Sequence, residues 1–547
     1  MALDRTATTY TDLVRGFAWT IPEYYNIGVD VCDRHALSPA RANNPAVIAE
    51  NDRGQITTMT FARLKTGSDR LANALRGLGI NKGDRVAVLL PQRPETLLTL
   101  IALFKVGAVA VPLYSLFGAE ALAWRLIDAG AEVVVTDSVG AQRVLDLALP
   151  TTPAVISVDA DAPAGVRRLD ELLTRATEYA AAADTLADDP ALLLYTSGTT
   201  GTPRGALLAQ RTLLAHLPGV ELPHGFLPHP DDLFWTPTDW AWIGGLLNLI
   251  LPALYHGIPV LACRGNRFDP EAALALMARH RVRNAFLPPT ALRLLRQLPP
   301  ERVRGVCTLR SIAAGGEPLG PSLLDWGRDT LGVTINEVYG QTECNIVICN
   351  SHGLFPVRPG SMGRTVPGHR VAIIDEHGQE LPPGHLGKIA IHRPDPAMFL
   401  GYWNNPEATA EKFVGDWMIT GDVGRQDADG YFWFVAREDD VIISSGYRIS
   451  PAELEDVLGR HPAVAQVAVI GVPDTARGSV VKAFVVPRDL SILDTPLGRA
   501  GLARDIQDHA RSRYAAHAYP RQVEFLEALP TSATGKIRRR ELRQQGG

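Results

Sequence analysis

The chain has 547 residues, 46% of them hydrophobic and 21% charged. That much apolar material excludes an intrinsically disordered chain, and the length suffices for roughly two to four domains. The 54 basic and 59 acidic side chains leave a net charge of −5, so the basic surface that nucleic acids require is not expected. The five cysteines lie far apart without a C-x-x-C pair, which argues against a disulfide framework and favours the reducing cytoplasm.

No integral membrane segment is expected in this sequence. Residues 1–24 carry charged side chains throughout, unlike a secretory signal. The longest apolar stretch, residues 97–117, is interrupted by Lys105 and Pro112. We interpret it as a buried helix followed by a strand, because a membrane span needs about 20 uninterrupted apolar residues.

Short apolar runs alternate with helical stretches through roughly the first four hundred residues. We expect strands at 85–90, 108–113 and 132–136, with helices at 95–105 and 120–129. Strands that alternate with helices in this way are typical of parallel sheets. The pattern therefore predicts an α/β protein.

The rest of the chain differs in composition. Residues 150–190 are rich in Ala, Asp, Thr and Pro and are expected to form a loosely ordered connection with one helix near 169–179. A turn-rich segment near residue 370 predicts a β-rich module. From residue 450, a Ser-Pro-Ala-Glu capping box begins a helix, and two further apolar runs follow it. These elements predict a small α+β domain of roughly a hundred residues.

The strongest local motif follows an apolar strand at residues 192–195. Three glycines alternate with five hydroxyl side chains and one cation, before a helix that we expect to begin near Ala206. Glycine backbone N–H groups and Ser/Thr hydroxyls converge on anions, so the loop predicts polyphosphate binding rather than an ordinary turn. It lacks the G-x-x-x-x-G-K-[ST] pattern of P-loop NTPases. The loop consists of Thr196, Ser197, Gly198, Thr199, Thr200, Gly201, Thr202, Pro203, Arg204 and Gly205.

This loop resembles the phosphate loop of the adenylate-forming superfamily, which contains acyl-CoA synthetases, firefly luciferase and peptide-synthetase adenylation domains. The superfamily usually has Lys where this chain has Arg204, a planar and bidentate cation. Further motifs follow in the superfamily's order over nearly the whole chain, so the sequence is identified as a member. These six motifs are residues 314–319, 338–343, 420–422, 437–440, 445–449 and 530–537.

The resemblance implies a fold class and a division of the chain. We expect an α/β protein whose large N-terminal body, residues 1–436, contains two α/β sheets and a β-rich module. A hinge at 437–441 would join this body to a small, mobile α+β domain at 442–547. The implied hinge residue is Asp439, for which a solvated acidic run is the alternative interpretation.

The resemblance also implies a site for ATP and Mg²⁺. The adenine would lie between a glycine-containing loop and an aromatic ring, and carboxylates would bind the ribose and the metal. The implied cofactor-binding residues are Thr196, Ser197, Gly198, Thr199, Thr200, Gly201 and Arg204 for the phosphates, Gly315, Gly316, Glu317, Pro318, Tyr339 and Gln341 around the adenine, Asp422 and Arg437 at the ribose, and Glu343 with Thr200 at Mg²⁺.

By the same resemblance, the chain is an ATP-dependent acid:CoA ligase. A carboxylate attacks the α-phosphorus of ATP and pyrophosphate leaves; the thiolate of coenzyme A then attacks the acyl carbonyl and AMP leaves. The first step brings two anions together, so catalysis is chiefly positioning and charge neutralisation. The implied catalytic residues are Lys536, Arg448 and Thr342, while Gly446 would line the thiol's approach and Arg477 would contact coenzyme A. A solvated basic tail is the alternative for Lys536, and an exposed Arg without a partner is the alternative for Arg477.

The carboxylic acid is the least defined substrate. Trp240 and Trp242 resemble a motif near the carboxylate pocket, although two tryptophans so close together are also typical of a core. Acetate-specific synthetases have Trp where this chain has Gly340, so the glycine favours a medium-chain, branched, alicyclic or aromatic acid. The chain most resembles medium-chain acyl-CoA synthetases, but Cys344 and Asn345 replace the Thr-Gly usual in that group.

Other functions stay open as alternatives. An acyl-AMP ligase could load a carrier protein, although no L-G-G-x-S carrier segment follows. The intact motifs disfavour an inactive nucleotide sensor, and the C-terminal likeness to synthetases disfavours a luciferase-like oxygenase. His216, His224 and His229 are expected in a surface loop rather than at a metal, and Cys344 and Cys349 are expected to be buried thiols. A homodimer is left open.

Overall fold

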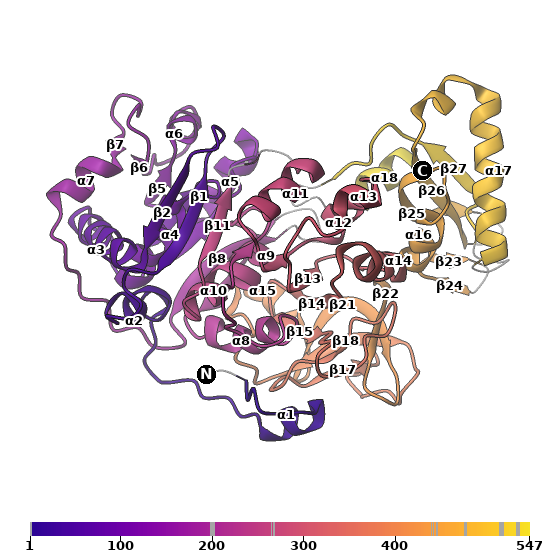
Figure 1. The fold of residues 1–547 in the computed structure, drawn as a ribbon, viewed down its shortest axis with the longest axis horizontal. Helices are drawn as coiled ribbons and strands as arrows, with labels where there is room; N and C mark the ends of the chain where they lie inside the picture. The colour runs from indigo at the N-terminus through magenta and orange to yellow at the C-terminus, as the bar shows by residue number, and fades with distance from the viewer. Residues whose placement is uncertain are drawn as a thin grey trace.

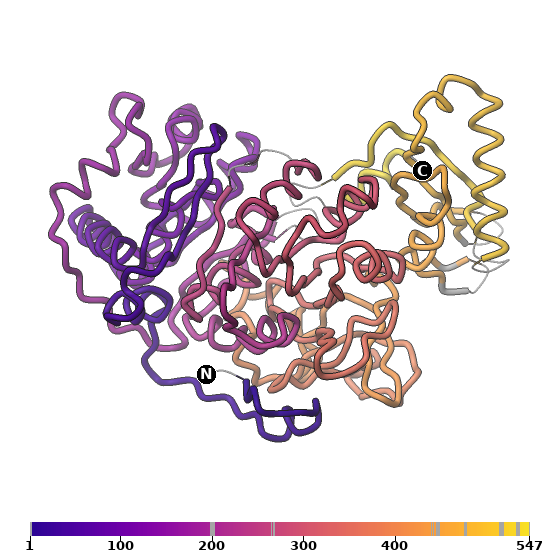
Figure 2. Tube along the Cα trace, in the orientation of Figure 1, coloured from indigo at the N-terminus to yellow at the C-terminus, as the bar shows by residue number. Residues whose placement is uncertain are grey.

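The computed structural model describes residues 3–196, 203–263, 265, 268–438, 440, 442–444, 447–474, 478–513, 519–531 and 537–546. Figures 1 and 2 show these residues as a large body and a smaller lobe at the C-terminal end. Within the described residues, the body contains two large sheets and a smaller antiparallel one, and the lobe contains a further sheet. This mixed architecture confirms the expected fold class.

The N-terminal sheet holds the two strands that flank the phosphate loop. Its strand order is β19-β9-β8-β4-β3-β5-β6-β7. Val86 and Val88 of β3 face one core, and Ala87 and Leu89 face another, so the sheet is buried on both sides. The strands are β3 (Arg85–Leu89), β4 (Val109–Pro112), β5 (Val133–Thr136), β6 (Ala154–Ser157), β7 (Arg167–Arg168), β8 (Pro190–Thr196), β9 (Arg204–Ala209) and β19 (Gly401–Tyr402), and the helices packed around them are α3 (Phe61–Gly77), α4 (Pro94–Val106), α5 (Ala119–Ala129), α6 (Ser138–Leu145) and α7 (Leu169–Arg175).

The apolar stretch at 97–117 is a buried helix followed by a strand, α4 and β4, as expected. Lys105 is fully buried near the end of α4, and its ammonium lies 2.6 Å from a carboxylate oxygen of Asp33 and 2.6 Å from one of Asp69. A buried charge is tolerated when it is paired. The lysine that interrupts the apolar run therefore ties α4 to α3 and to the π-helix η1 (Val29–Asp33).

Two local expectations are wrong. The helix expected near Ala206 is instead strand β9, which pairs antiparallel with β8, so the phosphate loop closes a hairpin. The apolar run there is only a few residues long, and burial between β8 and β19 makes it a strand. Helix α8 (Thr212–Glu221) begins later. Residues 150–190 are more ordered than expected, because β6 and β7 extend the sheet.

The central sheet carries the adenine motifs. Its order is β16-β15-β14-β13-β12-β10-β11-β1-β2, with β10 to β14 parallel and β14-β15 an antiparallel hairpin. The carboxyl ends of parallel strands meet at one edge of a sheet, so the segments after β13 and β14 lie side by side. The strands are β1 (Pro45–Glu50), β2 (Ile56–Thr60), β10 (Phe234–Trp235), β11 (Val260–Cys263), β12 (Asn284–Phe286), β13 (Ser311–Gly315), β14 (Ile335–Gln341), β15 (Asn345–Cys349) and β16 (Arg364–Thr365).

Helices cover both faces of the central sheet. One face packs in the main core, which includes α8, and the other packs in a second core with α11 and α14. The helical elements of this region are α9 (Ile243–Gly245), η2 (Leu246–Ile250), α10 (Leu251–Tyr255), α11 (Pro270–Arg279), α12 (Pro289–Leu295), α13 (Pro300–Val303), α14 (Pro321–Trp326) and η3 (Gly327–Leu331).

The expected β-rich module is present after the central sheet. Its order is β17-β18-β21-β20, and β22 pairs with β21. The N-terminal segment packs on this side of the body: the Tyr10 hydroxyl donates to the Thr365 carbonyl (2.7 Å), and the Trp19 indole N–H donates to the Gly368 carbonyl (2.9 Å). The elements are α1 (Tyr10–Gly16), β17 (Val371–Ile374), β18 (Gly387–His392), α15 (Pro406–Ala410), β20 (Phe413–Val414), β21 (Trp417–Gln426) and β22 (Phe432–Arg437). The short helix α2 (Arg34–Ala36) lies instead beside η1 and α3.

The C-terminal lobe has a sheet and a core of its own. The Ser450 side chain accepts a hydrogen bond from the Glu453 N–H (3.3 Å), which confirms the expected helix start. Leu454, Leu458 and Ile506 lie in the lobe's core. Among the described residues, no helix combines the length and apolarity that a membrane crossing requires. The elements are β23 (Ile442–Ser444), β24 (Tyr447–Ile449), α16 (Pro451–Gly459), β25 (Val464–Asp474), β26 (Gly478–Pro487), η4 (Leu490–Asp494), α17 (Pro496–Arg513), β27 (Gln522–Phe525) and α18 (Arg539–Gly546).

Candidate active site

The Asp422 carboxylate joins residues from three sequence motifs. Asp422 and Arg437 face each other across the antiparallel pair β21-β22, and Nη1 of Arg437 lies 2.9 Å from Oδ1 of Asp422. The Tyr339 hydroxyl, from β14, donates to Oδ2 (2.6 Å), and Nε2 of Gln341 donates to the same oxygen (3.2 Å). Tertiary packing therefore brings together four residues that the sequence proposed for the nucleoside.

Burial keeps the Tyr339 hydroxyl of this cluster protonated. Asp422 is only 4% exposed. Burial and the neighbouring Asp422 carboxylate raise the pKa of Tyr339 well above its usual value. The tyrosine is therefore a neutral hydroxyl that donates its proton in the hydrogen bond, and the carboxylate is held from both sides before any nucleotide binds.

The segment after β13 is fixed by backbone and side-chain contacts. A Cβ on Gly315 would lie 2.6 Å from the Val338 carbonyl oxygen, so the close approach of β13 and β14 requires glycine there. The Glu317 carboxylate accepts hydrogen bonds from the Thr290 hydroxyl (2.9 Å) and from Nη1 of Arg293 (2.9 Å). The expected adenine loop is thus anchored to α12.

Sequence reasoning missed Glu337, which lies beneath this loop. Its carboxyl accepts a hydrogen bond from the Leu319 N–H (3.2 Å), and burial raises the pKa of Glu337 to about 7. The available signal was an acidic residue two positions before Tyr339, between the apolar residues Ile335 and Val338. Glu337 holds the end of the adenine loop against β14.

Glu343 and Arg204 are linked through a residue that sequence reasoning also missed. The Tyr402 hydroxyl donates to Oε1 of Glu343 (2.5 Å), and burial together with the Glu343 charge raises the pKa of Tyr402. The Arg204 guanidinium lies 5.4 Å from the centre of the Tyr402 ring and 4.0 Å from the Glu411 carboxylate. Because β19 pairs with β9, Tyr402 is carried to the strand that begins at Arg204.

The donor set fits Mg²⁺. The ion prefers oxygen ligands and is usually held by one or two carboxylates together with substrate phosphates. Glu343 is 7% exposed and supplies such a carboxylate near a cation suited to phosphate. The described part of the chain contains no cluster of three His, Cys, Asp or Glu side chains that would hold a metal by protein ligands alone.

The backbone geometry of the β14-β15 hairpin explains glycine at position 340 and asparagine at position 345. A Cβ on Gly340 would lie 1.5 Å from the Asn345 carbonyl oxygen, so no side chain fits there while the hairpin keeps this shape. Thr342, Glu343 and Cys344 form the turn, and Asn345 follows it with a φ of 57°. Asn is among the few residues that tolerate this left-handed conformation. The conformation therefore explains why asparagine can replace the usual glycine at position 345.

The two tryptophans differ in environment. Trp240 is 1% exposed, and its indole N–H has no hydrogen-bond partner among the described residues. Trp242 is half-buried, packs against Gly244 and lies 5.8 Å from the Phe286 ring. Burial raises the pKa of Asp239, which precedes Trp240, to about 6. Trp240 is thus a core residue, while Trp242 keeps an accessible face.

Several expected site residues lie outside the described residues. Thr196 ends β8, and its hydroxyl donates to the Arg204 carbonyl (3.3 Å), so both edges of the phosphate loop are placed. Arg448 belongs to β24, but its side chain is outside the description. The remaining ones are Ser197, Gly198, Thr199, Thr200, Gly201, Asp439, Gly446, Arg477 and Lys536.

The expected surface loop is wrong for His216 and His224, while His229 does lie in a partly exposed loop. His216 lies within the buried helix α8 and pairs with the Asn248 amide (2.7 Å), and His224 is buried and pairs with the Ser311 hydroxyl (2.7 Å). His229 contacts the Gly225 carbonyl (2.8 Å). The prolines that suggested a loop are accommodated inside and after α8, where apolar neighbours bury the chain. Cys344 and Cys349 are buried thiols, as expected.

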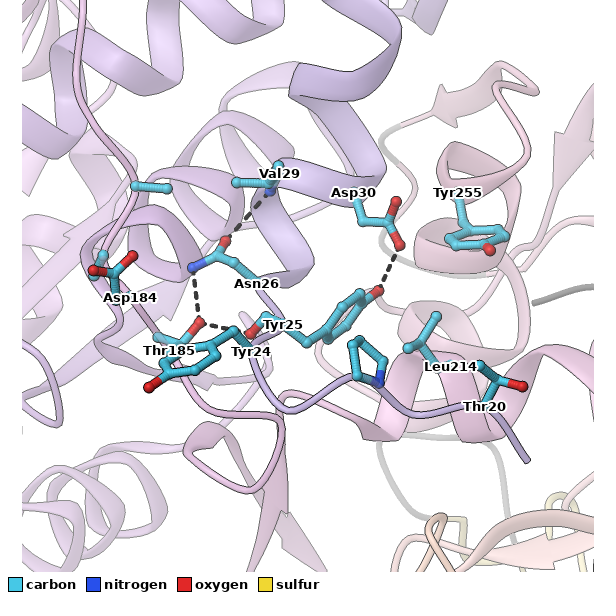
Figure 3. Close-up of a pocket in the computed structure, with 13 residues that line it drawn as sticks. Thr20, Tyr24, Tyr25, Asn26, Val29, Asp30, Asp184, Thr185, Leu214 and Tyr255 are labelled. Carbon is cyan, nitrogen blue, oxygen red and sulfur yellow. Dashed lines mark hydrogen bonds between the residues drawn. The ribbon is translucent and has the colours of Figure 1, made fainter.

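A cavity of about 470 Å³ lies away from these motifs. Figure 3 shows its lining, in which the Tyr25 hydroxyl donates to Asp30 (3.0 Å) and the Asn26 amide donates to the Thr185 hydroxyl (3.2 Å). Thr185 in turn donates to the Tyr25 carbonyl (2.6 Å). These polar groups bond to one another and hold the N-terminal segment in place. The cavity contains none of the motif residues.

Comparison with known proteins identifies the family of this chain. The family model for the AMP-binding enzyme matches residues 34–403, and that for the AMP-binding enzyme C-terminal domain matches residues 453–536. This chain belongs to the AMP-binding enzyme family. The human protein named acyl-coenzyme A synthetase ACSM4, mitochondrial, is 35% identical over 540 residues, which cover 96% of this chain and 91% of that protein.

Solved structures agree with the family over nearly the whole chain. The crystal structure of an acyl-CoA synthetase from Brucella canis is 34% identical with a TM-score of 0.76 and covers 98% of this chain and 99% of its own. The anthranilate CoA ligase AuaEII in complex with anthranoyl-AMP is 29% identical with a TM-score of 0.86 and covers 96% and 98%. Within its family, the chain is an AMP-forming acyl-CoA synthetase that uses ATP, Mg²⁺ and coenzyme A. These relatives do not favour the carrier-protein alternative.

Proposed function

We propose that this acyl-CoA synthetase activates a carboxylic acid larger than acetate: a medium-chain, branched, alicyclic or aromatic acid. The observation that carries the proposal is Gly340 in the hairpin β14-β15: acetate-specific synthetases have Trp at this position, and this hairpin leaves no room for a side chain there. The half-buried Trp242 beside Phe286 adds an apolar wall suited to a ring or an alkyl chain. The similar structures include an anthranilate CoA ligase and a benzoate CoA ligase, which supports the same range of acids.

The nucleoside half of ATP is assigned to the cluster around Asp422. The carboxylate would bind the ribose hydroxyls, with Arg437 beside it, and the Tyr339 ring would stack on the adenine. Gly315, Gly316, Glu317 and Pro318 would form the opposite wall. The support is the hydrogen-bonded contact among Asp422, Tyr339 and Arg437, which holds the groups in place before binding.

The phosphates are assigned to the edges of the β8-β9 hairpin and to the turn after β14. Thr342 would contact the α-phosphate, and Arg204 would neutralise charge on the phosphates. Mg²⁺ held by Glu343 with Thr200 would add further positive charge. The support is the link from Arg204 through Tyr402 to Glu343. The substrate carboxylate is ionised at neutral pH, so no general base is needed for its attack on the α-phosphorus.

The C-terminal domain is assigned a part in both half-reactions. We propose the division 1–436, 437–441 and 442–547, with Asp439 at the hinge. Lys536 would bridge the acid and the α-phosphate, with Arg448 as a further cation. After adenylation, rotation of the domain would bring Gly446 to the thiol's path and Arg477 to coenzyme A. The thiolate would then attack the acyl carbonyl and AMP would leave.

A panel of acids tests the substrate proposal. Acids from C2 to C12, with branched, alicyclic and aromatic members, are each supplied with ATP, Mg²⁺ and coenzyme A, and thiol-dependent AMP release is measured. We expect a kcat/KM at least tenfold higher for one of the larger classes than for acetate. Acetate as the best acid would contradict the proposal. A phosphopantetheinyl carrier offered in place of coenzyme A serves as the control for the carrier-protein alternative.

We also propose a cytoplasmic location. All five cysteines lie in the described residues and none of them forms a disulfide there, as is usual in a reducing compartment. Fractionation of the source cells with an activity assay tests this location.

A further inference from the structure

Helix α16 presents a carboxylate, Asp456, to the body, in addition to the hydrogen bond that the Ser450 hydroxyl donates to the Val435 carbonyl. The Ser322 hydroxyl, on α14, donates to Oδ1 of Asp456 (3.2 Å), and Nη1 of Arg296 donates to the Ser322 oxygen (3.0 Å). Arg460, which directly follows α16, pairs with the other oxygen of Asp456 (2.6 Å). The contact is therefore a relay of a cation, a hydroxyl and an anion that crosses between the body and the lobe.

The position of Asp456 leaves room only for glycine opposite it. A Cβ on Gly320 would lie 2.6 Å from Oδ1 of Asp456, and Gly320 has a φ of 77°, which side chains disfavour. Asp456 is 15% exposed, so water screens this contact less than it screens a surface ion pair. The Asp456 carboxylate therefore packs closely against the body at Gly320.

The contact is continuous with the adenine loop. Gly320 follows Leu319, whose N–H is held by Glu337. Arg293 binds Glu317, and Arg296 binds Ser322. The two arginines are three residues apart at the C-terminal end of α12, so they lie on the same side of the helix. The nucleotide segment and the contact with the lobe therefore share the same supports.

A second feature shows which part of the lobe faces the adenine loop. Arg539 lies in the segment that follows Lys536, and its guanidinium is bound by both oxygens of Glu455 (2.7 Å each). Burial alone would lower the pKa of Arg539, but Glu455 and the charge of Glu317 hold this pKa above its usual value. The start of α18 thus lies within electrostatic reach of the adenine loop in the same orientation.

We propose that Asp456 is a positioning residue for adenylation: its contact with Ser322 and Gly320 holds the C-terminal domain in the orientation that serves the first half-reaction. The proposal rests on the proposed function of the two half-reactions. Breaking the contact should slow the step that needs this orientation and spare the step that needs the domain to leave it.

The test separates the half-reactions in Asp456→Ala. We expect acid-dependent pyrophosphate exchange to fall about tenfold, as for the loss of one hydrogen bond to a charged group. Conversion of supplied acyl-adenylate and coenzyme A to thioester should stay within about twofold of wild type, because this step follows release of the contact. Asp505→Asn is the matched control, since this exposed carboxylate pairs with His461 inside the lobe. Equal losses in both half-reactions, or no loss in either, would overturn the proposal.

A second variant and a second readout keep the test decisive. Ser322→Ala removes the same hydrogen bond from the body side, so it should reproduce the loss in exchange without altering the lobe, and the double variant should lose little more than either single one. Small-angle X-ray scattering with ATP should show a broader domain arrangement in Asp456→Ala than in wild type. An unchanged profile would overturn the proposal whichever acid is used. Absence of wild-type exchange with every acid would instead contradict the proposed function, and scattering would still decide the role of Asp456.

Discussion

Among single residues, Asp422 organises the nucleoside end of the site. Each of its two oxygens already accepts a hydrogen bond, from Tyr339 on one side and from Arg437 on the other. These partners come from strands far apart in the chain, and they fix the carboxylate without a ligand. A group held in this way loses little conformational entropy when substrate binds.

Asp422→Asn should weaken ATP binding. The amide has no charge, and its NH₂ group must face one of the two donors, Tyr339 or Arg437. We expect the KM for ATP in pyrophosphate exchange to rise roughly tenfold or more, the effect of losing a hydrogen bond to a charged group. The control is Asp427→Asn, which removes a carboxylate in the same β21-β22 hairpin that pairs with Arg358. Similar changes in KM for both variants would contradict the role of Asp422.

Glu337 should make stability depend on pH near neutrality. Burial raises its folded pKa to about 7, above the usual 4.5. The folded state therefore binds the proton more tightly than the unfolded state, and this stabilisation, fully present below about 4.5, is lost as the pH rises through 7. Glu337→Gln keeps an acceptor for Leu319 and cannot ionise.

We expect Glu337→Gln to match wild type in thermal midpoint at pH 5 and to exceed it at pH 8. The gain in free energy of unfolding at pH 8 should be about 1–3 kcal/mol, the value of a shift of this size. Thermal unfolding at both pH values measures it, with the exposed Glu380→Gln as control. A difference between variant and wild type that is the same at pH 5 and pH 8 would count against the buried carboxyl.

At the scale of elements, the β14-β15 hairpin shows how backbone geometry selects residues. The chain turns over Thr342, Glu343 and Cys344, and Asn345 adopts the left-handed conformation at the end of the turn. The Asn345 carbonyl then occupies the space where a side chain on residue 340 would be. The turn that presents the expected phosphate and metal ligands thus requires glycine at one position and tolerates asparagine at the other.

Gly340→Ala and Asn345→Gly should behave oppositely. The added Cβ would meet a carbonyl oxygen at 1.5 Å, so the hairpin must shift. We expect Gly340→Ala to lose about 1–3 kcal/mol of stability, as overpacked sites do, and more than tenfold in pyrophosphate exchange. Asn345→Gly should stay within about 1 kcal/mol, because glycine adopts the same φ freely. Thermal unfolding and exchange rates measure both, and a well-tolerated Gly340→Ala would show that the hairpin is not constrained as described.

At the scale of the whole molecule, the proposed reaction is divided between the body and the lobe. The body's sheets assemble the groups assigned to ATP, and the lobe contacts it through Asp456 and near Glu317. The lobe has its own sheet and core, so it can change orientation without unfolding. A protein with this division can present two different faces of one domain to one substrate cleft.

Lys536→Ala should separate the two half-reactions more sharply than any change in the body. We expect acid-dependent pyrophosphate exchange to fall at least 10²–10³-fold, as for the loss of one preorganised donor. Thioester formation from supplied acyl-adenylate should remain, because it does not need the bridging ammonium. The neighbouring Arg540→Ala serves as a control for charge in the same basic segment. An equal loss in both half-reactions would show that Lys536 has no special part in adenylation.

Local sequence was enough for the elements between residues 85 and 136, for the capped start of α16 at Ser450 and for the order of the nucleotide motifs. These features depend on neighbouring residues: apolar runs, a side chain that caps its own helix, and glycines at fixed spacing. Only the tertiary structure decided that Ala206 begins no helix and that His216 and His224 are buried. It also decided that Tyr402 contacts Glu343, that Glu337 holds Leu319 and that Asp456 contacts Ser322. Strand pairing and burial set these outcomes, and both depend on residues that lie far away in the chain.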